Sequence, residues 1–220
     1  MGDDAYRPQR QAAKDATLEL SAIGNPQLMK DRTVGIFGTR NASVNSRLFT
    51  ITLTRELGAT GYVIDPGLAL GIDAAAHERT LVTGTIAAVA GRVNAIYPPE
   101  HAGLKDQIAT EGLIVGEARV DITPQARHFP SQNLVIASLS FGVLVIKASK
   151  NSGSLIPARC ASQQGCEVFA VPEPSLDPRA AGTNLLLRDG ATRVEGADDL
   201  ISALPKTWLE EPGIGAFGLL

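Results

Sequence analysis

From residue 33 onward, short apolar runs alternate with longer stretches that have the periodicity of amphipathic helices. The run Val143-Leu144-Val145-Ile146 has no polar face, which is typical of a strand buried on both sides in a parallel sheet. Strands are predicted at 33–37, 61–64, 84–90, 113–116, 142–148, 167–171 and 191–194. Helices are predicted at 46–57, 73–83, 103–111, 132–140, 154–164, 183–188 and 197–204. This alternation predicts an α/β fold, a three-layer α/β/α sandwich with a mostly parallel sheet.

The pattern divides the chain into three parts. Residues 1–30 have little apolar periodicity, and we expect an N-terminal lead-in that is frayed or helical. Residues 31–204 carry the alternating pattern and form the expected core. Residues 205–220 are expected to be an irregular C-terminal tail. A chain of 220 residues is long enough to bury a full core, and its length favours one domain.

Composition excludes several classes of protein. No apolar run approaches the roughly 18–20 residues that a membrane-spanning helix needs. The first residues, Met1-Gly2-Asp3-Asp4, lack an apolar signal core, so we expect a cytoplasmic protein. Cys160 and Cys166 form no C-x-x-C pair and no disulfide framework. The net charge of −3 argues against a protein that binds nucleic acid over its whole surface.

One part of the chain departs from this acidic average. No Asp or Glu occurs in the 45 residues between Asp121 and Glu167, where the composition predicts about five. The cations of this acid-free segment are Arg127, Lys147, Lys150 and Arg159. The pattern predicts a local positive face on an acidic protein.

The turns at the carboxyl ends of parallel strands are where ligands bind in such a fold. The first candidate turn is Gly38-Thr39-Arg40, in which a glycine and a hydroxyl would leave backbone N–H groups open to a phosphate. The alternative is an ordinary tight turn with a solvated arginine. The sequence does not match the G-x-G-x-x-G dinucleotide fingerprint.

The second turn runs from Gly67 to Gly71, with Asp73 and His77 behind it on one helix face. These two side chains are either an acid–base pair or, more simply, a helix cap and a hydrogen-bonded histidine.

The third turn, Ser152-Gly153-Ser154, follows the most apolar strand, and Ser154 is predicted to cap the next helix. Small hydroxyl residues at a helix N-terminus are suited to holding a phosphate. The fourth turn, Gly182-Thr183-Asn184, follows a loop that would close over a site. Phe129 is either an exposed ring on which a base stacks or a buried anchor for its loop.

Taken in order, the turns resemble the motifs of one known family. The motifs are Gly38-Thr39-Arg40, Gly67-Leu68-Ala69-x-Gly71-Ile72-Asp73-x-x-x-His77, Ile96-Tyr97-Pro98, Phe129-Pro130-x-x-Asn133, Ser152-Gly153-Ser154-Leu155-Ile156-x-Ala158-Arg159, Gln164-Gly165, Val168-Phe169-Ala170-Val171-Pro172 and Gly182-Thr183-Asn184. In this series the chain resembles the DNA-processing protein A (DprA/Smf) family over about residues 24–204. The resemblance implies an extended Rossmann-like core, here expected without the C-terminal winged-helix domain of many members. It also implies single-stranded DNA binding, a homodimer, and loading of the RecA recombinase during natural transformation, with no established catalytic reaction.

The chain departs from the family pattern at cationic positions. Leu70 stands where members usually carry arginine, and arginines expected around Asn133 are replaced by Ser131, Gln132 and Leu134. An acid common at the end of the central strand is Lys147 here. Since each neutralised phosphate strengthens binding and its salt dependence, we expect weakened DNA affinity.

The resemblance and the turns together define the predicted site. The predicted DNA- and phosphate-binding residues are Gly38, Thr39, Arg40, Gly67, Gly71, Phe129, Asn133, Lys147, Ser152, Gly153, Ser154, Arg159, Gly182, Thr183 and Asn184. We predict no catalytic residue, no metal ligand and no cofactor. The alternatives are a nucleotide-binding sensor and an enzyme like the nucleoside-monophosphate phosphoribohydrolases, in which Glu117 or Asp73 would supply the carboxylate.

Overall fold

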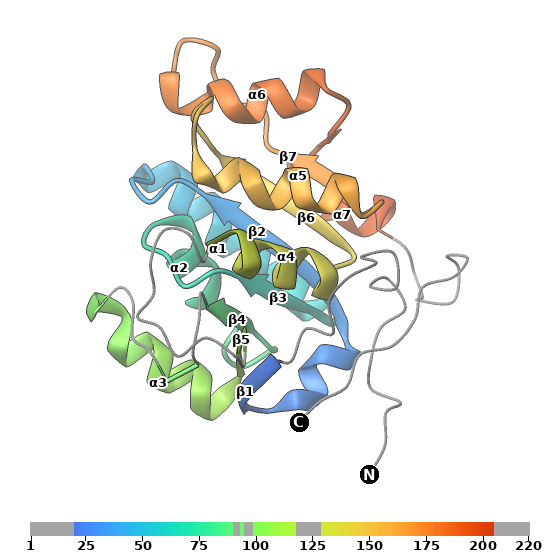
Figure 1. Ribbon diagram of the computed structural model, residues 1–220. Coiled ribbons are helices and arrows are strands. Elements are labelled where there is room, and N and C mark those ends of the chain that lie inside the picture. The colour runs from blue at the N-terminus through green and yellow to red at the C-terminus, as the bar shows by residue number, and fades with distance from the viewer. Residues whose placement is uncertain (1–19, 90–92, 95–98, 118–128, 205–220) are drawn as a thin grey trace.

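The computed structural model describes residues 20–89, 93–94, 99–117 and 129–204 (Figure 1). The strands are β1 (Leu20–Gly24), β2 (Arg32–Gly38), β3 (Tyr62–Pro66), β4 (Ile86–Val89), β5 (Leu113–Glu117), β6 (Gly142–Lys147), β7 (Glu167–Ala170) and β8 (Thr192–Arg193). The helices are α1 (Val44–Ala59), α2 (Ile72–His77), α3 (Ala102–Glu111), α4 (Phe129–Leu139), α5 (Ile156–Gln163), α6 (Ala181–Arg188) and α7 (Ala197–Ala203). Short 3-10 helices lie at Pro26–Lys30, Pro99–His101, Gly153–Leu155 and Pro178–Ala180.

The strands form two sheets that are mostly parallel. The larger sheet has the order β3-β2-β6-β7-β8, and each of its neighbouring pairs is parallel. The smaller sheet has the order β1-β5-β4, in which only β1 runs antiparallel to its neighbour. A parallel bridge between Ile64 and Thr85 joins the larger sheet to the segment that leads into β4. The predicted α/β fold with a mostly parallel sheet is confirmed.

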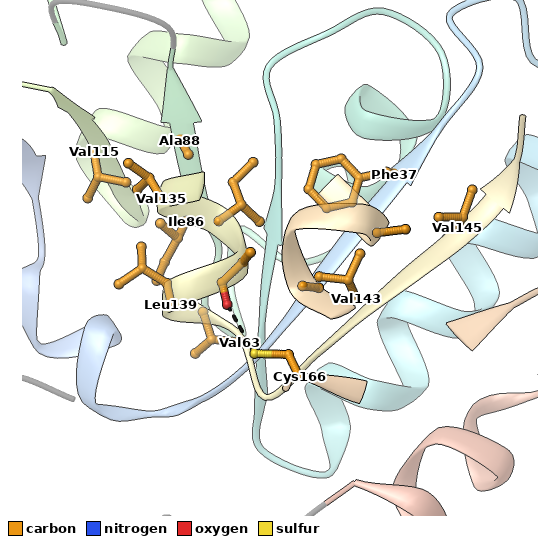
Figure 2. Close-up of a cluster of buried hydrophobic side chains, with 14 of the residues drawn as sticks. Phe37, Val63, Ile86, Ala88, Val115, Val135, Leu139, Val143, Val145 and Cys166 are labelled. Atoms are coloured by element: carbon orange, nitrogen blue, oxygen red, sulfur yellow. Dashed lines mark hydrogen bonds between the residues drawn. The ribbon is translucent and has the colours of Figure 1, made fainter. Parts of the chain in front are cut away.

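Helices cover both faces of the larger sheet and make three layers (Figure 1). The apolar run in β6 alternates between the two faces, as a strand must. Val143 and Val145 belong to one apolar cluster with α4 and α5, part of which is drawn in Figure 2. Leu144 and Ile146 belong to a second cluster with α1, α2 and α7. All four side chains are fully buried, so this run fixes the centre of the molecule.

Local signals place α1, the longest helix in the described residues. The Ser43 hydroxyl accepts a hydrogen bond from the Ser46 N–H at 3.2 Å and caps the first turn. Leu53 and Leu57, four residues apart, face the sheet and are buried. Gly61 follows the helix with φ of +84°, a conformation that favours glycine.

Two local predictions are wrong. The lead-in was expected to be frayed or helical, but Leu20–Gly24 is a strand paired with β5, because Leu20 and Ile23 contribute to the apolar clusters as strand residues do. Helix α2 ends at His77 rather than at residue 83, since residues 78–83 form turns that lead towards β4 through Gly84, whose φ is +117°. Residues 1–19 and the tail 205–220 lie outside the described part of the chain.

None of the helices in the described part of the chain is long and apolar enough to cross a membrane.

Candidate functional site

Four strand-to-helix turns meet at the carboxyl edge of the larger sheet. They follow β2 (residues 38–43), β3 (66–71), β6 (148–155) and β7 (171–180). All four strands are parallel, so their carboxyl ends lie on one side. The predicted turns are therefore brought together by the sheet, and the contacts between them define the candidate site.

The first and second turns pack directly on each other. The Ile72 N–H donates a hydrogen bond to the carbonyl oxygen of Thr39 at 3.3 Å. Gly71 has φ of +82°, and a Cβ there would overlap the carbonyl oxygens of Thr39 and Arg40. A Cβ on Gly38 would lie 2.5 Å from Cγ1 of Ile72. These glycines are thus required by the close approach of two turns, whether or not a ligand is present.

The third turn is tied to the first through a serine. The Ser154 hydroxyl donates to the carbonyl oxygen of Gly38 at 2.8 Å. The prediction that Ser154 caps the following helix is wrong: Ser152 caps the 3-10 turn Gly153–Leu155, and its hydroxyl accepts from the Ser154 N–H at 3.2 Å. This 3-10 turn precedes α5, whose N-cap position is taken by Leu155 without a side-chain cap.

The fourth turn also packs against backbone. The N–H of Gly182 donates to the carbonyl oxygen of Ala148 at 2.8 Å, and a Cβ on Gly182 would lie 2.5 Å from the carbonyl oxygen of Ser149. The Thr183 hydroxyl is buried and donates to the carbonyl oxygen of Ala180 at 2.9 Å. Gly182 and Thr183 therefore hold the loop after β7 against the end of β6.

Several backbone donors of these turns are already in use. The Thr39 N–H donates to the carbonyl oxygen of Lys147 at 2.7 Å, and the Asn41 N–H donates to the Thr39 hydroxyl at 3.2 Å. The Ser154 N–H is taken by Ser152, as described above. The prediction that the turns leave their N–H groups open to a phosphate is wrong for these three groups. The exposed Gly153, with nothing within 4 Å of a Cβ placed on it, is the open point of the third turn.

Behind the second turn, His77 has a structural environment. Its Nε2 lies 3.1 Å from the carbonyl oxygen of Gly67 and its Nδ1 lies 2.8 Å from the Thr85 hydroxyl. A nitrogen facing a carbonyl must carry a proton, so Nε2 donates to the Gly67 carbonyl oxygen. Burial lowers the pKa of His77 to about 4, and the ring is neutral at pH 7.

Asp73 lies under the same turn. The α2 helix begins at Ile72, so Asp73 is inside the first helical turn rather than at the cap position. Its Oδ2 accepts from the Ala69 N–H at 3.4 Å. Burial raises the pKa of Asp73 to about 7 despite the opposing effects of this bond and of Arg40 nearby. Asp73 and His77 form no hydrogen bond with each other, and each has other partners. This favours separate structural roles for the two side chains over an acid–base pair.

Lys147 differs most from its predicted role as a phosphate contact. Its side chain is 5% exposed, and its Nζ lies 2.8 Å from Oε2 of Glu173 and 2.8 Å from Oδ2 of Asp177. Burial by itself lowers the pKa of Lys147, but the hydrogen bonds to the two carboxylates outweigh it and raise the pKa. The ammonium is charged and neutralised inside the protein.

The other predicted residues occupy more varied positions. Arg40 is exposed in the first turn, and Arg159 is exposed one turn into α5. Asn133 is buried on α4, which begins at Phe129, and the Phe129 side chain lies outside the described part of the structure. The Asn184 side chain binds both backbone polar groups of Glu173, donating to its carbonyl oxygen at 2.9 Å and accepting from its N–H at 3.2 Å.

Sequence reasoning missed three side chains at this edge. Glu173 and Asp177 lie outside the acid-free segment in sequence, yet they fold onto its Lys147. The signal was the parallel order of β6 and β7, which places the residues after β7 beside the end of β6. Lys150 was noted as a cation but not assigned to the site, and it is exposed between the end of β6 and the third turn.

The fold and the turns define a Rossmann-like α/β protein whose strand-to-helix turns converge on one edge of a parallel sheet. The family model for DNA recombination-mediator protein A matches residues 1–205. The chain belongs to this family.

A curated relative supports this membership. The DNA processing protein DprA of Bacillus subtilis (strain 168) is 40% identical over 195 residues, which cover 87% of this chain and 66% of that protein. The chain thus spans slightly less than two thirds of that relative's length.

Two solved structures are similar over nearly the whole chain. The X-ray structure of DprA from Streptococcus pneumoniae superposes with a TM-score of 0.84 at 32% identity, covering 93% of this chain and 73% of that one. DNA processing protein A from Helicobacter pylori, whose structure concerns its single-stranded DNA binding mode, superposes with a TM-score of 0.80 at 32% identity, covering 92% of each chain. These neighbours confirm the Rossmann-like fold.

Proposed function

We propose that the protein binds single-stranded DNA at the carboxyl edge of the larger sheet, as part of a DNA-processing role. The observation that carries the proposal is the family membership, together with the fold shared with a relative from Helicobacter pylori that is described by its single-stranded DNA binding mode. The edge offers exposed cations next to glycine-rich turns, and phosphate contacts of this kind supply sequence-independent affinity.

Three cations would contact the DNA backbone. Arg40 follows the first turn, Lys150 precedes the third, and Arg159 lies on the first half of α5. Gly153 gives the backbone of the third turn room to approach a phosphate, since nothing would touch a Cβ there. These four residues replace the larger predicted set as the groups expected to touch DNA directly.

The affinity is expected to be low. Leu70 is exposed in the second turn, where the family resemblance implies an arginine, and Lys147 is already neutralised by two carboxylates. With few exposed cations at this edge, binding has the strength of non-specific electrostatic association, with a dissociation constant of about 1–100 μM at physiological salt.

We propose no catalytic step. The enzymatic alternative needs a carboxylate at a nucleotide site, and of its two candidates Asp73 is 5% exposed beneath the second turn, while the Glu117 side chain lies outside the described part of the structure. The buried position and the internal hydrogen bond of Asp73 support a structural role.

The family resemblance extends the proposal to assembly. A homodimer that loads RecA onto single-stranded DNA during natural transformation is the role implied for this chain. Size-exclusion chromatography with light scattering tests the dimer, and a RecA strand-coating assay on protein-covered DNA tests loading. A monomer at micromolar concentration, or no change in RecA coating, would contradict this extension.

The binding proposal is tested by fluorescence anisotropy with labelled oligo-dT at low salt. The Arg40→Ala/Lys150→Ala protein should bind at least tenfold more weakly than the wild type, because two phosphate contacts are lost. Arg188→Ala is the control, since Arg188 is exposed at the far end of α6 and its loss removes a positive charge away from the edge. Equal affinity for all three proteins would overturn the proposed site.

A further inference from the structure

The loop between β7 and α6 (residues 171–180) delivers two carboxylates to a cation on another strand. Glu173 and Asp177 each place an oxygen 2.8 Å from Nζ of Lys147. Asp177 is also held by Arg179, whose Nε and Nη2 both donate to its carboxylate at 3.0 Å. The four side chains sum to zero charge, so this part of the acid-free segment presents no net attraction to a polyanion.

The carboxylates are fixed in place rather than loosely attached. The Asn184 side chain holds the backbone of Glu173 on both its N–H and its carbonyl oxygen. The Asp177 carboxylate also accepts from the Arg179 N–H at 2.9 Å, which closes the short 3-10 turn. At the end of the loop, Gly182 is bonded to Ala148, the residue after Lys147. The loop is therefore tied down at its beginning, its middle and its end.

Lys147 lies next to the first turn. Its Cα is in register with Gly38 on the neighbouring strand, and its carbonyl oxygen accepts from the Thr39 N–H at 2.7 Å. The same strand end leads within three residues to the exposed Lys150. Without the two acids, the Lys147 ammonium would add to the cations of this edge.

We propose that Glu173 and Asp177 act as an intramolecular substitute for DNA phosphate at Lys147, and that the loop thereby lowers the affinity of the edge for single-stranded DNA. This inference rests on the proposed function. It assigns to the two acids a role in setting affinity, in addition to satisfying a buried ammonium.

The test is a variant that removes the acids while retaining the loop. In Glu173→Ala/Asp177→Asn, alanine opens space beside Lys147, and the asparagine side chain can still accept from the Arg179 N–H. Oligo-dT binding should tighten about threefold or more at 50 mM NaCl. The variant releases Lys147 and also Arg179, the second partner of Asp177, so the log–log salt slope should steepen by about 1.4, which is about 0.7 for each cation. Adding Lys147→Met should remove about half of the added slope.

The matched control is Glu167→Ala/Asp189→Asn. Glu167 begins β7 and Asp189 follows α6, so both exposed acids lie at the opposite edge of the sheet. The control removes the same charge and should leave the slope unchanged. An unchanged slope in the test variant, with DNA binding intact in the wild type, would overturn the inference and leave the proposed function standing. Failure of both proteins to bind DNA would overturn the function and the inference together.

A measurement without DNA tests whether the Lys147 ammonium is released. Site-resolved mass spectrometry after amine acylation should show Lys147 protected in the wild type and at least fivefold more reactive in the test variant. Protection that persists in the variant would contradict release of the ammonium. If circular dichroism shows that the double variant does not fold, the single variant Glu173→Gln tests the inference. This variant should fold, because Asp177 remains as a partner for the buried ammonium of Lys147. It should bind about twofold more tightly than Glu167→Gln, and equal binding would overturn the inference.

Discussion

The Ser154 hydroxyl donates a hydrogen bond to the carbonyl oxygen of Gly38 across 116 positions of the sequence, at 2.8 Å. The two residues belong to different strand-to-helix turns, after β6 and after β2. The bond satisfies a carbonyl at the end of a central strand and fixes the spacing of the first and third turns. The geometry of the edge is therefore set by contacts within the protein, before any ligand is considered.

Replacing Ser154 tests this link. Ser154→Ala leaves the Gly38 carbonyl without its side-chain donor and should lower the free energy of unfolding by about 1 kcal/mol. Ser162→Ala, on the exposed face of α5, should change it by less than about 0.5 kcal/mol. Urea denaturation followed by circular dichroism measures both. Equal stability of the two variants would show that the link contributes nothing.

The glycines of the first and second turns give a larger expected effect. Gly38→Ala drives a methyl group to 2.5 Å from Ile72, and Gly71→Ala adds an unfavourable φ of +82° to a backbone overlap. Each should cost about 1–3 kcal/mol or more in thermal or urea unfolding.

The contrasting glycine is Gly103 in α3, where a Cβ meets nothing within 4 Å. Gly103→Ala should stabilise the protein by about 0.5–1 kcal/mol, because alanine is the better helix former. Similar effects at Gly38 and Gly103 would contradict the packing account of the turns.

Asp73 and His77 should give opposing pH dependences of stability. The pKa of Asp73 is raised from 3.8 to about 7, so the folded state keeps a proton that the unfolded state has lost, and stability falls as pH rises across this window. The pKa of His77 is lowered from 6.5 to about 4, so stability falls as pH drops from 6.5 towards 4. Between about pH 4 and 6.5 the two slopes cancel, each being at most about 1.4 kcal/mol per pH unit.

Single substitutions separate the two contributions. Asp73→Asn should leave the His77 slope, with stability rising from pH 4.5 to 6.5. His77→Gln should leave the Asp73 slope, with stability falling from pH 4.5 to 7. Urea denaturation at a series of pH values measures the slopes, and the exposed Asp189→Asn is the control. If the free energy of unfolding of both variants changes with pH as that of the wild type does, the assigned pKa directions are refuted.

The larger features of the fold were readable from the sequence because they depend on local periodicity. The unbroken apolar run in β6 predicted a strand buried on both faces, and its side chains do alternate between two apolar clusters. Strand β1 was missed because Leu20 is the only buried residue in Leu20–Gly24 and the strand pairs with a strand almost a hundred positions away. Such long-range pairing leaves little local signal.

The sequence predicted where the turns of the candidate site lie, but it did not predict which of their charged side chains are neutralised. Glycine and hydroxyl patterns correctly placed the four turns at one edge of a parallel sheet. The acid-free segment, however, is a property of one stretch of sequence, and the loop after β7 brings Glu173 and Asp177 onto Lys147 from outside it. The same holds for Ser154, whose hydroxyl is taken by Gly38 instead of a helix cap. Contacts between turns decided both cases, and the spacing within one motif does not report them.

The salt dependence of oligo-dT binding tests the central claim most directly. Dissociation constants measured by anisotropy between 25 and 150 mM NaCl give the log–log slope for the wild type and for Arg40→Ala/Lys150→Ala. If these two cations contact phosphates at the carboxyl edge, the slope of the variant should be shallower by about 1.4, with Arg188→Ala unchanged. A wild-type protein that binds oligo-dT with the same slope as the double variant would contradict DNA binding at this edge.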